Sequence, residues 1–79
     1  MEEDEEFQKD AFLCRLGTHI AKVRSSKGYS QDRLTLESGL ARGTVSKVEN
    51  ALVDPKASTL AKMAQTIGVP LSKLVDIKL

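Results

Sequence analysis

The chain has 79 residues, of which 41% are hydrophobic and 29% are charged, and its formal net charge is +1. This composition predicts one small globular domain, and the apolar runs are far shorter than the ~20 residues that span a bilayer. One cysteine and one histidine exclude an internal disulfide and argue against a zinc site built from this chain alone.

The charges are unevenly distributed along the chain. Residues 1–10 carry six acidic side chains against Lys9, a net charge of −5, and because the whole chain carries +1, residues 11–79 carry +6. A basic domain favours a polyanionic partner, which the acidic segment would modulate. The start MEEDEEF is also unlike a secretory signal, so we expect a cytoplasmic protein without membrane contact. We divide the chain into an acidic N-terminal extension, residues 1–10, and a domain over residues 11–79.

Helical periodicity predicts the first helix over about residues 8–26. Its apolar residues fall within an arc of about 100° and form a stripe that faces a core. These residues are Phe12, Leu13, Leu16, Ile20 and Val23. Gly28 is expected to end the helix in a left-handed conformation. Cys14 and His19 diverge around this helix, so we assign them structural or surface roles.

A second helix is expected from Gln31 to about Glu37, with Ser30 as its N-cap and Leu34 in the core. Gly39 follows at a tight turn that requires a positive φ. The third helix is expected over residues 42–50, and Val45 and Val48 should anchor it in the core. The second helix, the turn and the third helix have the length and pattern of a helix-turn-helix.

In a helix-turn-helix the second of the two helices lies in the major groove of double-stranded DNA. The residues of this third helix that face away from the core are then predicted to read bases: Arg42, Gly43, Thr44, Ser46 and Lys47. Arg42 and Lys47 are long donors suited to guanine O6 and N7, or to phosphate. A solvated helix face would have a similar composition, so the pattern alone leaves both interpretations open.

Two further short helices are expected after the loop at Asp54-Pro55. Ser58 should cap the fourth, and Gly68 should end it. Pro70 and Ser72 open the fifth, and alternating apolar residues over 75–79 also permit a short edge strand. The expected fold is a compact all-α domain of five helices. No Ser/His/Asp set, carboxylate pair or phosphate-binding glycine loop is found, so we expect no catalysis, no metal and no cofactor.

From Leu16 to Leu74 the chain resembles the Cro/C1-type helix-turn-helix family (the XRE family) of phage repressors and small bacterial regulators. The resembling segments are, in order, LGTHIAKVR, KGYSQDRL, SGLARGTVSKVEN, DP and STLAKMAQTIGV. The resemblance implies a lambda-repressor-like DNA-binding domain in which Arg42, Gly43 and Lys47 read bases. Thr44 and Ser46 match positions that contact bases or the DNA backbone. The resemblance also implies phosphate contacts for Gln31, Asn50 and Lys56. A further implication is a structural ion pair between Arg24 and Glu49.

Four positions depart from the family pattern. Thr35 stands where the family prefers alanine, so the crossing of the second and third helices is expected to open slightly. Ala41 replaces a hydroxyl N-cap and Gly43 follows in the first turn; each change costs about 1 kcal/mol in other helices. The third helix is therefore expected to be poorly ordered without DNA. Ala51 replaces a glycine, which makes Asn50 the expected left-handed residue.

The sequence thus predicts a transcriptional regulator, a repressor or autoregulator that binds a palindromic operator as a homodimer. Two copies would read half-sites about one DNA turn, ~34 Å, apart. They would pair through the apolar ends of the last two helices or through residues 75–79. A phage repressor, a restriction–modification controller and an antitoxin autorepressor all fit, in the bacterial nucleoid or a phage-infected host. The alternative is an antitoxin-type interaction module whose acidic extension binds a basic protein partner, such as a toxin, and which autoregulates its operon.

Overall fold

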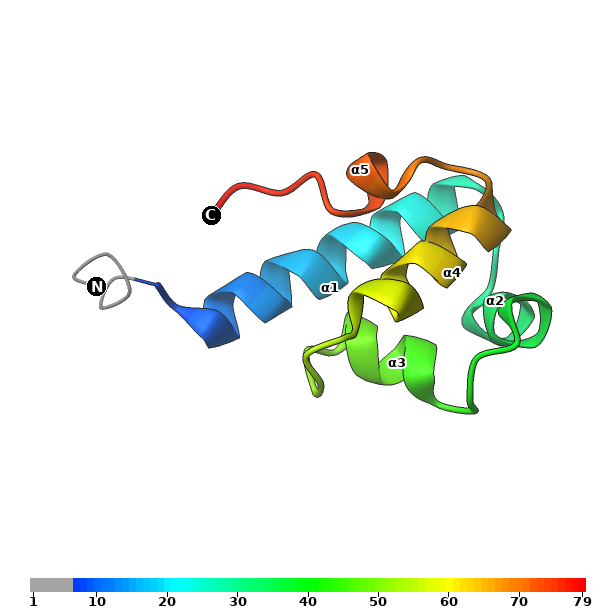
Figure 1. Cartoon of the computed structure of the whole chain (residues 1–79), viewed down its shortest axis with the longest axis horizontal. Coiled ribbons are helices and arrows are strands. Elements are labelled where there is room, and N and C mark those ends of the chain that lie inside the picture. The colour runs from blue at the N-terminus through cyan, green and yellow to red at the C-terminus, as the bar shows by residue number, and fades with distance from the viewer. Residues whose placement is uncertain (1–6) are drawn as a thin grey trace.

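The computed structural model describes residues 7–79, which form five helices joined by short loops (Figure 1). Their bounds are α1 (Lys9–Ser26), α2 (Gln31–Ser38), α3 (Thr44–Glu49), α4 (Ala57–Ile67) and α5 (Leu71–Leu74). The expected all-α, five-helix fold is confirmed. Over residues 7–79 there is no strand, so the alternative of an edge strand over residues 75–79 is wrong. The first six residues of the predicted acidic extension lie outside the described residues.

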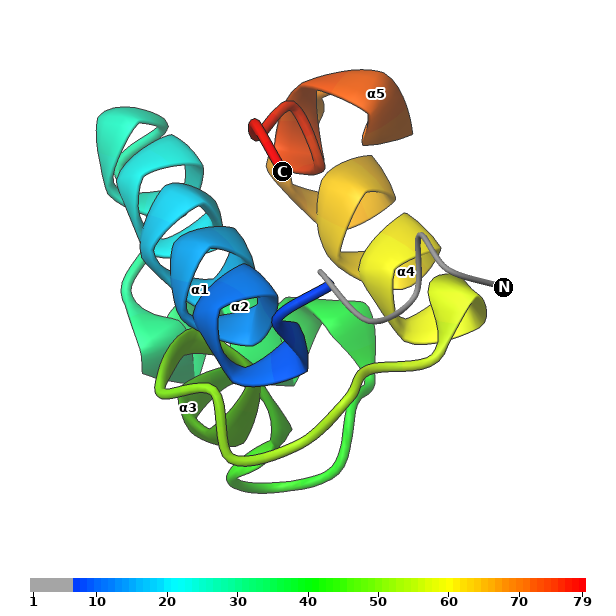
Figure 2. The same cartoon turned by 90° about the vertical axis from the view of Figure 1, so that its left-hand side faces the viewer.

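A single core lies between the helices. The predicted stripe of α1 faces it, with Leu13, Leu16, Ile20 and Val23 buried and Phe12 packed at its edge. Each of the other four helices contributes at least one buried apolar side chain: Leu34, Val45, Val48, Met63, Ala64, Ile67 and Leu74. α3 packs against α1 and α2, whereas α5 packs against α4 and α1. α3 and α5 therefore contact α1 from different sides, as the two views show (Figures 1 and 2).

The ends of α2 form as its sequence predicts. The Ser30 hydroxyl accepts a hydrogen bond from the Arg33 backbone N–H at 3.0 Å, which satisfies one of the free donors of the first turn. Gly39 ends the helix with φ +74°, a conformation that suits glycine because it has no Cβ. The glycines expected to be left-handed after α1 and α4, Gly28 and Gly68, also have positive φ.

α1 and α3 approach each other most closely at Gly17. A Cβ placed on Gly17 would lie 2.5 Å from the Glu49 carbonyl oxygen and 2.7 Å from the Val48 carbonyl oxygen. Gly17 is in the middle of a helix, where glycine is disfavoured by about 1 kcal/mol relative to alanine. Its place is explained by the close packing of the α3 C-terminus on α1. The only sign of this contact in the sequence is a glycine inside an apolar helical pattern.

α3 begins two residues later than expected. Its N-cap is Gly43, which has φ +87° and no side chain to accept a hydrogen bond, and the first helical residue is Thr44. The expectation that Ala41 is the N-cap is therefore wrong, and so is the placement of Arg42 and Gly43 inside the helix. Gly43 has a left-handed conformation where the chain enters α3. A residue with a Cβ would adopt this conformation only at a cost in free energy.

The C-terminus of α3 also differs from the expectation. Asn50 has φ −96°, and the residue with positive φ is Ala51, at +59°. The Ala51 N–H donates to the Val48 carbonyl at 3.2 Å, and the Leu52 N–H donates to the Lys47 carbonyl at 2.9 Å. These two bonds are those of a Schellman motif, which requires its left-handed residue immediately after the C-cap. The motif places the left-handed conformation at Ala51 although asparagine would adopt it more readily.

The start of α4 corrects one further expectation. Its N-cap is Lys56, with no side-chain cap, and Ser58 lies inside the first turn rather than before it. None of the helices in the described residues is both long and apolar enough to cross a bilayer.

Candidate nucleic-acid interface

α2, the turn at Gly39 and α3 form one unit, and α3 lies at the edge of the molecule (Figure 1). Val45 is fully buried and Val48 is 2% exposed, so these two side chains anchor α3 in the core as expected. The opposite side of the helix carries polar residues. Arg42 and Lys47 are exposed, and Gly43, Thr44 and Ser46 are half-buried. The result is a short polar and basic ridge supported by two valines.

The residues of the ridge come partly from a turn and partly from a helix. Arg42 and Gly43 belong to the turn before α3, whereas Thr44, Ser46 and Lys47 belong to the helix. A Cβ built on Gly43 would have no atom within 4 Å, so the chain is open to close approach at this point. Lys56 is exposed at the N-cap of α4, in the segment that follows α3. Three long basic side chains, Arg42, Lys47 and Lys56, are thus exposed around this part of the molecule.

Asn50 is hydrogen bonded within α3. Its Nδ2 lies 2.9 Å from the Ser46 carbonyl oxygen and 3.2 Å from the Ser46 Oγ. A carbonyl oxygen only accepts, so the contacting atom of the Asn50 amide must be the nitrogen. The two contacts engage the nitrogen that carries both hydrogens of the amide. The side-chain atom of Asn50 that remains unengaged is its oxygen.

A partly buried network joins α1, α2 and α3 beneath the ridge. The Arg24 guanidinium donates to both carboxylate oxygens of Glu49, from Nε at 2.7 Å and from Nη2 at 3.0 Å. Gln31 Nε2 donates to the same carboxylate at 2.8 Å. The Arg24 and Glu49 side chains are 13% and 4% exposed. Glu49 therefore holds one residue from each of the two neighbouring helices, and Gln31 is oriented from the end of α3.

A second cluster, which sequence reasoning missed, lies on the outer side of α2. The Arg33 guanidinium lies 4.1 Å from the centre of the Tyr29 ring and donates to Glu37 at 2.9 Å. The Tyr29 hydroxyl also donates to the Thr66 carbonyl at 3.1 Å, which links the loop before α2 to the end of α4. The hydrogen bond from Arg33 lowers the pKa of the Glu37 carboxyl. A Tyr-x3-Arg-x3-Glu spacing is the only signal of it in the sequence.

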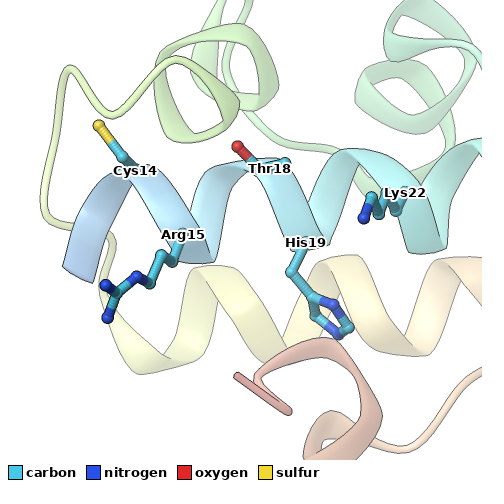
Figure 3. Close-up of a pocket in the computed structure, with 5 residues that line it drawn as sticks. All are labelled: Cys14, Arg15, Thr18, His19 and Lys22. Carbon is cyan, nitrogen blue, oxygen red and sulfur yellow. The ribbon is translucent and has the colours of Figure 1, made fainter. Parts of the chain in front are cut away.

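An open hollow of about 300 Å³ lies on the outer face of α1 and is lined by Cys14, Arg15, Thr18, His19 and Lys22. Arg15 and His19 extend from one side of the helix, whereas Cys14 and Thr18 lie along its other edge (Figure 3). Arg15 donates to the Leu79 carbonyl and His19 contacts the Lys73 carbonyl, each at 2.8 Å. These contacts hold the C-terminal segment against α1. Within residues 7–79 no three His, Cys, Asp or Glu side chains gather as metal ligands would.

The helix-turn-helix family model matches residues 20–74, which include all of α2, α3 and α4. The chain belongs to this family, the Cro/C1-type helix-turn-helix (XRE) family. The crystal structure of the restriction-modification controller protein C.AhdI from Aeromonas hydrophila has the same fold, with a TM-score of 0.77. It is 30% identical to this chain and matches 81% of this chain and 97% of C.AhdI.

Curated relatives of this XRE chain are named as transcriptional regulators. The HTH-type transcriptional regulator SlrR of Bacillus subtilis (strain 168) is 36% identical over 62 residues, which are 77% of this chain and 41% of SlrR. The HTH-type transcriptional regulator PuuR of Escherichia coli (strain K12) is 35% identical over 57 residues, 72% of this chain and 31% of PuuR. The chain thus spans about two-fifths or less of the length of these two relatives. It carries a helix-turn-helix DNA-binding domain of the kind found in transcriptional regulators.

Proposed function

We propose that this chain is a sequence-specific transcriptional regulator that binds double-stranded DNA and acts as a repressor or autoregulator. The observation that carries the proposal is the ridge over residues 42–47. It is polar, basic and accessible, and two buried valines fix it on a helix-turn-helix scaffold. Access to DNA places the protein in the cytoplasm, at the bacterial nucleoid or in a phage-infected host.

The residues of the ridge supply different contacts in this proposal. Arg42 approaches a base edge from the turn, and Lys47 from the middle of α3, because both are exposed and long enough to reach guanine O6 and N7. Thr44 and Ser46 are short, so they contact bases only where the helix is close to the groove floor. Gly43 permits that approach because nothing projects from it.

Phosphate contacts flank the ridge in the same proposal. Lys56 is exposed in the segment after α3, and Gln31 begins α2, whose N-terminus faces the same side of the unit in helix-turn-helix proteins. Gln31 is held by Glu49, so it reaches a phosphate from a fixed position. Phosphate contacts set the register of a protein on the duplex and carry little sequence information.

The proposed regulator binds as a homodimer to a palindromic operator. One six-residue α3 offers few base contacts, whereas two copies related by a two-fold axis double the site that is read. The proposed contact between copies is the apolar side of α5 and the residues after it. Leu71, Val75 and Leu79 are 41%, 37% and 84% exposed there. This face is remote from α3, because α3 and α5 contact α1 from different sides.

The direct test is selection of binding sites from random duplex DNA at roughly physiological salt, repeated with Lys47→Ala. We expect an enriched palindrome, with preference weakened by ~1–3 kcal/mol at one position per half-site in the variant. An equal loss on every sequence would make Lys47 a phosphate contact. Absence of any enriched site with folded protein would refute sequence-specific binding.

Lys56→Ala is the matched control for a contact outside α3. If Lys56 binds a phosphate, affinity falls by a similar factor on all sequences, and the slope of log K against log salt decreases by about one. The enriched sequence stays the same. An unchanged salt slope would rule out this role for Lys56.

A second candidate function is an antitoxin-type interaction module that binds a basic protein partner and autoregulates its operon. The observation that favours it is that apolar side chains are exposed before α1, where Phe7 is 50% exposed, and in the loop after α3, where Leu52 is 70% exposed. Lys9 lies 3.6 Å from Asp54, so the start of α1 is close to the loop after α3. Residues 2–6, which precede Phe7, are all acidic. Loss of a co-purifying protein on deletion of residues 1–6 would favour this candidate.

A further inference from the structure

The hydrogen bonds between Asn50 and Ser46 have a consequence for the direction in which the Ser46 hydroxyl points. The Asn50 amide nitrogen donates to the Ser46 Oγ at 3.2 Å, and its identity as the nitrogen is fixed by its second contact, with the Ser46 carbonyl at 2.9 Å. One lone pair of the Ser46 hydroxyl is therefore occupied from within α3. Within residues 7–79 no acceptor is found for the proton of this hydroxyl, which is left to be donated outward.

A hydroxyl that accepts one hydrogen bond becomes a stronger donor, because the accepted bond polarises its O–H group. In the major groove, guanine presents O6 and N7 as acceptors, thymine presents O4 and adenine presents N7, whereas cytosine presents only the N4 amino donor. A serine that is biased to donate discriminates against cytosine. A serine that rotates freely does not, because a hydroxyl can donate or accept.

We propose that Asn50 is a positioning residue that biases the Ser46 hydroxyl toward donating, so that a base with an acceptor edge is preferred over cytosine at the position facing Ser46. The inference rests on the proposed function, since it assigns a base preference to a residue of the proposed reading ridge. It replaces the sequence-based assignment of Asn50 as a phosphate contact. Phosphate oxygens accept hydrogen bonds, and the unengaged side-chain atom of Asn50 is itself an acceptor.

The geometry also distinguishes Asn50 from a residue that only stabilises α3. The end of the helix is closed by backbone hydrogen bonds from Ala51 and Leu52, which do not involve the Asn50 side chain. Asn50→Ala therefore leaves the Schellman motif in place. What it removes is the donor that faces Ser46, so the expected effect is on base preference and not on folding.

The experiment begins with Ser46→Ala. In the site selected by the unmodified chain, this variant should lose preference at one position per half-site, and that position is the base that faces Ser46. Four duplexes that differ only there are then compared in competition binding. We expect cytosine to be disfavoured about two- to tenfold relative to guanine or thymine, the range expected for one hydrogen bond.

Two variants of Asn50 separate the possible roles. Asn50→Ala should reduce the discrimination against cytosine, because the Ser46 hydroxyl is released. Asn50→Asp has nearly the same shape, but its carboxylate turns away from the Ser46 carbonyl, which only accepts, and accepts the Ser46 proton instead. The hydroxyl oxygen is then left facing outward as an acceptor. Asn50→Asp should therefore shift preference toward cytosine. The added charge weakens binding to all four duplexes alike and cancels in their ratio.

The double variant Ser46→Ala/Asn50→Ala provides the decisive control. If Asn50 acts through Ser46, adding Asn50→Ala to Ser46→Ala changes none of the ratios among the four duplexes. An equal loss on every duplex, in both backgrounds, would show that Asn50 contacts phosphate and would overturn the inference. So would a Ser46→Ala variant that keeps every preference. Absence of an enriched site for the unmodified chain would overturn the proposed function as well. Thermal unfolding of each variant checks the fold, and Asn50→Asp carries the test if Asn50→Ala is unfolded.

Discussion

At Ala51 the backbone adopts a left-handed conformation that is unfavourable for alanine. Its φ of +59° brings the Cβ close to the neighbouring peptide, which costs roughly 1–2 kcal/mol for an L-residue. The strain is imposed by the two backbone hydrogen bonds that end α3. We predict that Ala51→Gly raises the free energy of unfolding by about 0.5–1 kcal/mol, the remainder being lost to the greater freedom of glycine in the unfolded chain.

Urea unfolding followed by circular dichroism would measure this change. Ala61→Gly, on the exposed side of α4, is the matched control, because the same substitution at a helical φ should lower stability by about 1 kcal/mol. If both variants are destabilised to the same degree, the left-handed conformation at Ala51 is not strained.

These residue-level conformations explain where sequence reasoning failed. Asparagine and glycine are the residues that tolerate positive φ, so Asn50 was the reasonable choice over Ala51. Which residue is left-handed depends on where α3 ends. The backbone hydrogen bond from Leu52 to the Lys47 carbonyl fixes that end. At the other end, Gly43 is expected inside the helix although glycine is disfavoured there, and the structure has it just before the helix as the N-cap. The register of a short helix is set by packing, and the sequence pattern does not report it.

At the scale of elements, the existence and order of the five helices could be predicted and their mutual approach could not. The stripe of α1 and the buried valines of α3 follow directly from helical periodicity. The contact of Gly17 with the last turn of α3 depends on two helices that are separated by α2 in the sequence. Nothing in the local pattern of either helix specifies it. The ridge residues were found because they lie opposite the valines, whereas the bond from Asn50 to Ser46 requires side-chain positions.

The packing of α1 on α3 gives a prediction for Gly17→Ala. Alanine favours helix formation, but its Cβ would lie 2.5 Å from a carbonyl oxygen of the backbone, which cannot move without displacing α3. We expect a net loss of about 1–3 kcal/mol in the free energy of unfolding, as for other overpacked sites. Thr18→Ala, at the neighbouring exposed position of α1, is the control and should change stability little. Denaturant titration of the two variants would compare them, and equal stability would show that α3 adjusts freely.

The network around Glu49 gives a second prediction at this scale. Glu49→Ala leaves the partly buried Arg24 guanidinium with its hydrogen bond to the Tyr29 carbonyl but without its carboxylate, and Gln31 loses its partner in α3. We expect a loss of about 3–5 kcal/mol, which approaches the whole stability of a small domain. Replacing both charges, as Arg24→Met/Glu49→Leu, should recover most of it because no unpaired charge remains.

The double variant also separates stability from DNA binding. It would fold without the carboxylate that orients Gln31, so its affinity should fall on all DNA sequences while its unfolding midpoint recovers. Chemical unfolding and DNA binding measured on the same samples would show both effects. A double variant that is as unstable as Glu49→Ala would mean that the hydrogen bonds, rather than charge pairing, hold the three helices together.

At the scale of the whole molecule, the uneven distribution of charge along the chain affects its expected affinity for DNA. Residues 11–79 carry +6, which attracts a polyanion, and residues 1–10 carry −5, which opposes that attraction. The contact of Lys9 with Asp54 places the start of α1 beside the loop between α3 and α4. The same loop contains Lys56. Lys9 is therefore near the loop that carries a proposed phosphate contact, and charges interact over about 8 Å at physiological salt.

This arrangement predicts the effect of deleting residues 1–6, which removes five acidic side chains. DNA affinity should rise on specific and non-specific sequences by the same factor, because the repulsion acts through charge alone. The factor should be largest at low salt and should shrink as the Debye length falls toward ~3 Å at 1 M. A variant with the same residues changed to glutamine and asparagine, which keeps the length of the chain, should reproduce the deletion. Fluorescence anisotropy over a salt series would test both variants. An affinity gain that persisted at high salt, or that appeared in the deletion but not in the amide variant, would mean that the segment blocks DNA sterically and not by its charge.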